Sequence, residues 1–307
     1  TIQPLPALPP TGRRSALANW LTQPDQPLTP RVAVNRLWQY HFGRGLVKTA
    51  SDFGRLGEPP THPELLDWLA GQLLQHNWQW KPLHRQLVTS ATYRQAAAEA
   101  STVAKLRDPD NRLWWRMNVR RLDAEQIRDA LLQATGELDL AMGGPSAEWS
   151  RPRRSVFTRV IRNQRDPLLD VFDSPDHILS TAERNVTTTP NQALLMMNGK
   201  YLLDRAQVLA QQVAQTAARS TDNSSAQATP PDNSSNPTAA AEATAAGERP
   251  EALVRALYRR VLRREPTAAQ LTVAVDFLQS AGTEAQLTAL TDLAHVLLNT
   301  NEFLYID

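Results

Sequence analysis

Residues 31–45, "RVAVNRLWQYHFGRG", have the periodicity of an amphipathic helix that ends at a glycine. At 100° per residue, the apolar side chains share one arc with a histidine: Val34, Leu37, Trp38, His41 and Phe42. Such an arc predicts a helix that packs against a core. His41 lies in the middle of the arc and Asn35 at its edge, so the stretch raises both a structural and a chemical question.

Helical periodicity dominates the rest of the chain. It recurs at 14–22, 63–76, 82–96, 123–136 and 190–216, and in three further segments after residue 250. Alternation typical of a strand is confined to "SVFTRVI", residues 155–161. We therefore predict a mainly α fold: a multi-helix body with at most a small two-stranded element, and a docked C-terminal three-helix segment.

Composition divides the chain into four parts. Residues 1–12 resemble a linker from a preceding domain, and residues 13–216 form the predicted helical body. Residues 217–250 are rich in Ser, Ala and Pro and lack large apolar side chains, so we expect a disordered insert. Residues 251–307 are the C-terminal helical segment, which is too short to be more than marginally stable alone and should dock on the body.

Charge and cysteine content exclude several kinds of protein. The 307 residues carry a formal net charge of +2, so we expect no nucleic-acid partner. The chain has no cysteine, which excludes disulfides, thiolate metal sites and covalent haem attachment; we expect no cofactor within this chain. No apolar run approaches the length of a membrane span, and the first 30 residues lack the pattern of a signal peptide.

Four helix starts match a capping box, in which two side chains reciprocally satisfy exposed backbone amides. The pairs are Thr61 with Glu64, Asp123 with Gln126, Thr189 with Gln192, and Thr267 with Gln270. Many conspicuous polar residues therefore have a structural role before any chemical one is considered.

Several long motifs occur in a recognisable order. Together with the stretch from residue 31, "RRLDAEQIRDALL", "MGGPS" and "FDSPDHILSTAERNVTTTPNQALLMMN" resemble a C-terminal domain of unknown function. That domain occurs in planctomycete and verrucomicrobial cell-envelope proteins that also carry a planctomycete-type cytochrome c domain. The resemblance covers about residues 10–216 and resumes from 250. It implies an exported or periplasmic setting and partner domains on the same polypeptide, but no established activity.

The first candidate site is Asn35, Arg36 and His41. His41 could act as a proton shuttle or ligand, with Asn35 and Arg36 binding a ligand beside it. The structural alternative places the ring beside Trp38, where it donates to a carbonyl or carboxylate. We favour this alternative and predict a buried, hydrogen-bonded His41.

A second cluster contains Glu58, His62, Glu64 and Asp67 in "GEPPTHPELLDW". These are possible cation ligands, but capping explains Glu64 and the spacing matches no zinc pattern. We predict no metal site.

The third candidate is "LLDVFDSPDHILSTAERN", residues 168–185. Asp173 and Asp176 could serve as the paired carboxylates of a glycoside hydrolase, one protonated and one ionised, with Arg184 orienting one of them. Asx turns around Ser174–Pro175 and a salt bridge to Arg184 provide the structural alternative.

Two further features concern binding. Among the eight tryptophans, Trp78 and Trp80 in "HNWQWKP" are the best candidates for exposed rings that stack on sugars. The arginine-rich run 151–165 precedes "DPLLDVFD", so we expect its arginines to pair with the protein's own carboxylates.

Two functions follow from these observations. The leading one is a binding or scaffolding module of an exported multidomain protein, with polysaccharide or envelope protein as possible partners. The alternative is a carboxylate-dependent hydrolase acting on envelope or algal polysaccharide. The sequence leaves open whether the protein is an enzyme.

Overall fold

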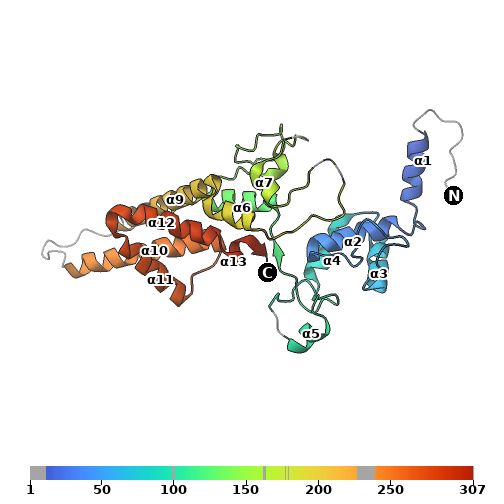
Figure 1. Ribbon diagram of the computed structural model, residues 1–307, viewed down its shortest axis with the longest axis horizontal. Helices are drawn as coiled ribbons and strands as arrows, with labels where there is room; N and C mark the ends of the chain where they lie inside the picture. Colours follow the sequence, from blue (N-terminus) through green and yellow to red (C-terminus); the bar gives the residue numbers. More distant parts are fainter. Residues whose placement is uncertain are drawn as a thin grey trace. The chain divides into compact units, whose positions relative to one another are not determined.

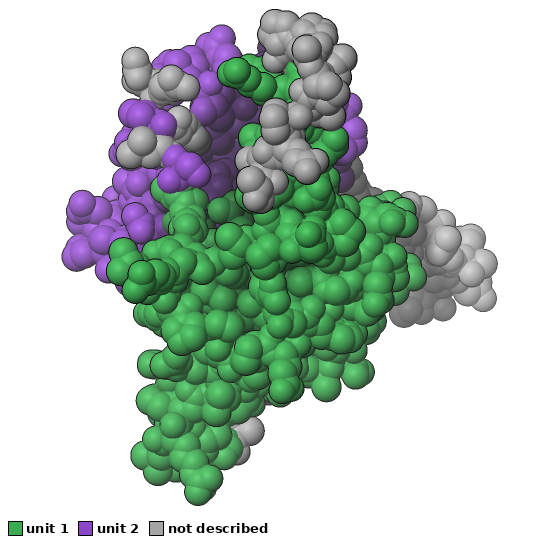
Figure 2. All heavy atoms as spheres, turned by 90° about the vertical axis from the view of Figure 1, so that its right-hand side faces the viewer, with its two compact units in different colours: residues 1–120, 181–183, 307 green, residues 121–180, 184–306 purple. Residues whose placement is uncertain are grey.

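The structure is a computed structural model that describes residues 12–98, 101–161, 164–176, 178, 180–226 and 239–306 (Figure 1). As predicted, the described residues are mainly helical, and their only sheet is a two-stranded antiparallel pair, β1 (Arg120–Arg121) with β2 (Tyr305–Ile306). The chain divides into two compact units, coloured separately in Figure 2. Unit 1 comprises the described residues up to Arg120 with Thr181–Glu183, and unit 2 comprises Arg121–Ser180 with Arg184–Ile306. The division falls inside the stretch that the sequence suggested was one body.

Unit 1 contains the first five helices: α1 (Gly12–Leu21), α2 (Thr29–Phe42), α3 (Pro63–Gln75), α4 (Trp80–Thr89) and α5 (Thr102–Arg107). Helix α2 packs against α3 and α4. The predicted arc of α2 is largely buried: Val34, Leu37, Trp38 and Phe42 all belong to the core of this unit. The periodicity of α2 thus determines which of its faces packs on the core.

Aromatic packing and a glycine define the end of α2. The rings of Trp38 and Phe42 stack with centroids 4.0 Å apart, and Trp114 meets Phe42 edge-on at 5.4 Å. Gly43 ends the helix with φ of 85°, and its amide donates to the carbonyl of Gln39. A left-handed residue at this position favours glycine because it has no Cβ.

Three of the four predicted capping boxes are present, at the starts of α6, α8 and α11. The fourth prediction was wrong. Helix α3 begins after His62, and the Thr61 amide donates to the carbonyl of Leu46 at 2.9 Å. Thr61 therefore anchors a loop and does not cap α3.

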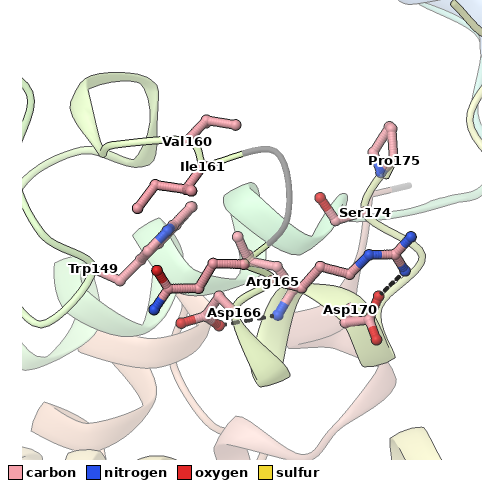
Figure 3. A pocket seen from close by; sticks show the side chains of 10 residues that line it. Trp149, Val160, Ile161, Arg165, Asp166, Asp170, Ser174 and Pro175 are labelled. Carbon is pink, nitrogen blue, oxygen red and sulfur yellow. Dashed lines mark hydrogen bonds and ion pairs between the residues drawn. The ribbon is translucent and has the colours of Figure 1, made fainter. Parts of the chain in front are cut away.

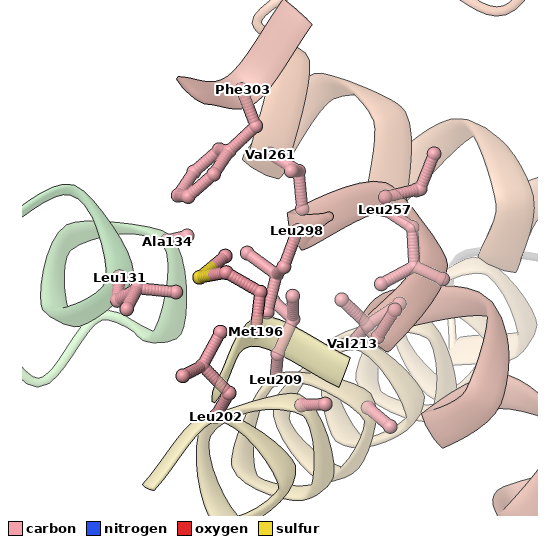
Figure 4. Packing of buried hydrophobic residues seen from close by; sticks show 14 of the residues in the cluster. Leu131, Ala134, Met196, Leu202, Leu209, Val213, Leu257, Val261, Leu298 and Phe303 are labelled. Carbon is pink, nitrogen blue, oxygen red and sulfur yellow. The ribbon is translucent and has the colours of Figure 1, made fainter. Parts of the chain in front are cut away.

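Unit 2 contains the remaining helices: α6 (Ala124–Thr135), α7 (Pro167–Val171), α8 (Pro190–Asn198), α9 (Lys200–Ala226), α10 (Ala239–Leu262), α11 (Ala268–Ser280), α12 (Gly282–Leu298) and α13 (Asn301–Leu304). Helix α9 packs against α6, α10 and α12. Figure 4 shows Leu202, Leu209 and Val213 of α9 facing side chains of the C-terminal helices. The C-terminal helices therefore share one core with α9. Burial of each leucine in such a core contributes about 1.5–3 kcal/mol.

Both ends of the expected disordered insert are helical in the structure. Helix α9 continues to Ala226 and α10 begins at Ala239. Alanine has the highest helix propensity, so the alanine-rich start of α10 can extend a helix that is already nucleated by packing. Residues 227–238 lie outside the described residues.

The strand predicted at 155–161 was wrong. Ser155–Phe157 instead form a short 3₁₀ helix. The Ser155 amide donates to Asp129 at 2.9 Å, and the buried Arg128 donates to the backbone carbonyls of Trp149, Arg151 and Arg153. Asp129 thus satisfies the first amide of the segment, while Arg128 holds the preceding loop through its backbone carbonyls.

Candidate functional site

A groove of about 710 Å³ lies between α2 and α4 in unit 1. Its lining residues are Leu28, Thr29, Val32, Ala33, Arg36, Leu37, Tyr40, Trp80 and His84. Val32, Arg36 and Tyr40 are successive turns of one α2 face, while Trp80 and His84 are one turn apart on α4. Helical spacing on two packed helices therefore brings these side chains together.

The groove exposes two large aromatic side chains to solvent. Tyr40 is 79% exposed and Trp80 is 42% exposed. Arg36 is also exposed and has no ion pair with any described residue. Exposed aromatic rings beside an unpaired cation are typical of a binding surface, since packing does not account for them.

His41 lies next to the groove and hydrogen-bonds to a groove residue. Its Nε2 is 2.8 Å from Nδ1 of His84, and its ring meets Tyr93 edge-on at 5.9 Å. We predicted a buried, hydrogen-bonded His41; the hydrogen bond is present, but the ring is only half-buried, and its partner is the exposed His84 of α4 and not a carbonyl or carboxylate. Burial lowers the pKa of His41, and the nearby His84 and Arg120 lower it further.

Two other predicted binding residues lie inside unit 1. Asn35 is completely buried, with its amide side chain bonded to both the N–H (2.8 Å) and the carbonyl (3.0 Å) of Val47. A Cβ on Gly45 would come within 2.7 Å of Asn35 Nδ2, so this loop requires a glycine. Trp78, expected to be exposed like Trp80, is half-buried and packs against the core.

In the acidic segment, residues 168–185, Asp173 of unit 2 is hydrogen-bonded to several neighbouring residues. Asp173 accepts hydrogen bonds from Arg121 (2.8 Å), from the Thr187 amide (2.9 Å) and hydroxyl (2.7 Å), and from Gln192 (3.3 Å). Its φ of 63° lies in the left-handed region, which Asp tolerates better than most residues. Burial opposes ionisation, but the bonds from Thr187 and Arg121 outweigh it and hold the pKa of Asp173 below its usual value.

Asp176 and Arg184 have other partners nearby. Asp176 lies 3.9 Å from Arg165, which bonds Asp170 at 2.6 Å. Arg184 forms a two-pronged ion pair with Glu125, at 2.5 and 2.9 Å. The pocket beside this segment has a volume of about 20 Å³ and is shown in Figure 3. A space of that size holds about one water molecule, and none of Asp173, Asp176 and Arg184 lines it.

The chain matches a family model over residues 13–278. It belongs to the PSD1 family of proteins of unknown function (DUF1553). No curated protein and no solved structure matches it. The match confirms that the motifs quoted above mark a domain of unknown function, and it assigns the PSD1 family no activity.

Three arginines of the arginine-rich run in this PSD1 chain pair with carboxylates, as expected for the run. Arg159 bonds Glu148 at 2.7 Å, Arg165 bonds Asp170 at 2.6 Å, and Arg153 lies 3.9 Å from Asp139. In the described part of the chain, no three His, Asp or Glu side chains come together as a metal site. None of the helices described is both long and apolar enough to cross a membrane.

A second hollow, of about 680 Å³, lies in unit 2 between α8 and α12. Its walls are mostly apolar, and Arg121 and Gln192 at its polar end already bond to each other and to Asp173. Because Arg121 and Gln192 already form hydrogen bonds within the protein, they are less available to a ligand than the polar side chains of the α2–α4 groove in this PSD1 chain.

Among the aromatic and cationic residues of the groove, the sequence pointed to Arg36 and Trp80 but not to Tyr40 and His84. Tyr40 follows Arg36 by one turn on the side of α2 opposite its core arc, and His84 follows Trp80 by one turn. An aromatic residue such as Tyr40 on the polar face of an amphipathic helix could have indicated a binding surface. No local sequence pattern indicated that α2 lies beside α4, because that arrangement depends on how the helices of this PSD1 chain pack.

Proposed function

We propose that the protein is a non-catalytic carbohydrate-binding module, and that the α2–α4 groove is its binding surface. The observation that carries this proposal is the pair of exposed rings, Tyr40 and Trp80, lining one groove with Arg36 and His84. This refines the binding role expected from the sequence.

The chemistry of sugars suits such a surface. A pyranose ring has an apolar face of C–H groups and an edge of hydroxyls, so its face stacks on an aromatic side chain while its hydroxyls bond polar neighbours. Tyr and Trp have few rotatable bonds and lose little conformational entropy on binding. An open groove also admits a polymer that continues beyond the contact, and binding of this kind uses no cofactor.

The acidic segment supports binding over hydrolysis. A glycoside hydrolase requires one protonated and one ionised carboxyl on either side of a sugar. Asp173 is bonded to Arg121 and Thr187 with a lowered pKa, which suits a structural carboxylate and not the protonated partner of such a pair. The hydrolase built on Asp173, Asp176 and Arg184 is therefore the alternative that the same experiment tests.

The proposed setting is an exported, cell-envelope polypeptide in which this module works beside other domains. The resemblance of its motifs to such proteins supports this setting. Fractionation of cells that express the full-length protein tests it: the protein should be found in the envelope or periplasmic fraction, and a purely cytoplasmic protein would contradict it.

The function is tested by measuring binding of the full chain to a panel of immobilised neutral and acidic polysaccharides, with reducing-end release scored separately. Tyr40→Ala and Trp80→Ala should each weaken binding about tenfold or more, because hot-spot rings contribute about 2 kcal/mol or more. Trp68→Ala is the matched control, since Trp68 is 50% exposed on α3 outside the groove.

Three outcomes would contradict the proposal. Wild-type protein that binds no member of the panel would contradict it directly. An equal loss in Trp68→Ala would show non-specific stacking. Release of reducing ends that Asp173→Asn or Asp176→Asn abolishes would establish the hydrolase instead.

A further inference from the structure

We propose that the α2–α4 groove selects acidic sugars, which carry a carboxylate or a sulfate group. This inference rests on the proposed carbohydrate-binding function and specifies its ligand. The observation behind it is the charge of the two helices that form the groove.

Neither helix carries an acidic residue. Helix α2 reads "TPRVAVNRLWQYHF" and α4 reads "WKPLHRQLVT". Between them they contain four side chains of permanent positive charge, Arg31, Arg36, Lys81 and Arg85. The surface they form therefore favours an anionic ligand, although the net charge of the whole chain is only +2.

The cationic side chains differ in whether they already form an ion pair within the protein. Arg31 bonds Asp67 at 2.6 Å, and this hydrogen bond raises the pKa of Arg31. Arg36, Lys81 and Arg85 are exposed, and their side chains have no hydrogen bond or ion pair with any described residue. Three charges are therefore available to a ligand without breaking an existing interaction.

Arg36 has the position to contact the ligand directly. It lines the groove between Val32 and Tyr40, one helical turn from each. Side chains one turn apart have Cβ atoms about 5–6 Å apart, close to the width of a pyranose ring. A sugar that stacks on Tyr40 can thus place its acidic group on Arg36, whose planar guanidinium donates two parallel hydrogen bonds to a carboxylate or sulfate.

Lys81 and Arg85 lie beside the groove and act at longer range. Each follows a groove residue, Trp80 or His84, by one position, so each is turned about 100° away from the groove on α4. Charges in such positions accelerate association with an anionic polymer and lose this effect as salt rises.

The test uses pairs of polymers that share a backbone and differ in charge. Polygalacturonate against its fully methyl-esterified form tests a carboxylate, and dextran sulfate against dextran tests a sulfate. The full wild-type chain should bind at least one acidic polymer about tenfold or more tightly than its neutral counterpart. Arg36→Gln should weaken binding to the acidic polymer more than binding to its neutral counterpart, so that the preference is lost.

Arg55→Gln is the matched control, because Arg55 is an exposed arginine of the same unit that lies outside the groove and forms no ion pair with any residue the structure describes. Equal losses in Arg36→Gln and Arg55→Gln would show general charge attraction and overturn the inference. Equal wild-type binding to neutral and acidic polymers would also overturn it, while a loss in Trp80→Ala would still support carbohydrate binding. Absence of binding to every polymer would contradict the proposed function itself.

Discussion

The Asp173 cluster of unit 2 and the α2–α4 groove of unit 1 both gather polar residues, but they differ in how those residues are satisfied. Asp173 accepts hydrogen bonds from three residues, and the side chain of Arg121 is only 6% exposed. In the groove, Arg36 has no partner among the described residues, and Tyr40 and Trp80 face solvent. A polar group that the protein has already satisfied stabilises the fold, whereas an exposed group without a partner is available to a ligand.

The largest effect is expected from Arg121→Ala. The change leaves Asp173, which is 15% exposed, without its counter-ion, and loss of one partner of such a buried pair costs about 3–5 kcal/mol. The free energy of unfolding from denaturant titration checks this value. Arg159→Ala, which removes an exposed pair with Glu148, should cost less than about 1 kcal/mol. Similar values for the two variants would remove the contrast between buried and exposed pairs.

Asn35→Ala should be the next most destabilising change, at about 2–4 kcal/mol. It leaves both the N–H and the carbonyl of Val47 without a partner in the core of unit 1. Its neighbour provides the control: Arg36→Ala should change the free energy of unfolding by less than about 0.5 kcal/mol. An Asn35→Ala protein of unchanged stability but weaker ligand binding would contradict this prediction and would support Asn35 as a ligand-binding residue.

His41→Ala should cost about 1–2 kcal/mol, because it removes the bond to His84 and part of the packing against Tyr93. A double-mutant cycle with His84→Ala isolates the bond, whose coupling should be about 0.5–1.5 kcal/mol. Additive effects of the two changes would mean that the rings touch without stabilising each other.

The smallest effect is the pH dependence that His41 confers. Its pKa is lowered by burial and by His84 and Arg120, and the groups that face it are His84, Tyr93 and Arg120. Because the folded protein binds the proton on His41 less readily than the unfolded chain, stability should fall as the pH drops below about 6.5. The decrease between pH 7 and pH 5 should be smaller in His41→Gln. An unchanged or steeper decrease would contradict this sign.

The sequence alone determined the helical class, the buried face of α2 and three of the four capping boxes. These features depend on residues within a few positions of one another, where helical spacing places the side chains. The family motifs extend through the same segments and identified a domain of unknown function. The strand prediction at 155–161 failed because Ser155 donates its amide to Asp129, 26 positions away, and Ser155–Phe157 turn into a 3₁₀ helix.

Only the tertiary structure decided which partners the polar residues found. The Asp173 carboxylate meets Arg121 from 52 positions away, Arg184 meets Glu125 from 59, and His41 meets His84 from 43. The groove likewise exists only because α2 packs against α4 with Tyr40 and Trp80 on the open side. Local propensity determines that a helix forms and which face is apolar, but the choice among many possible ion pairs and grooves depends on how buried surfaces fit together.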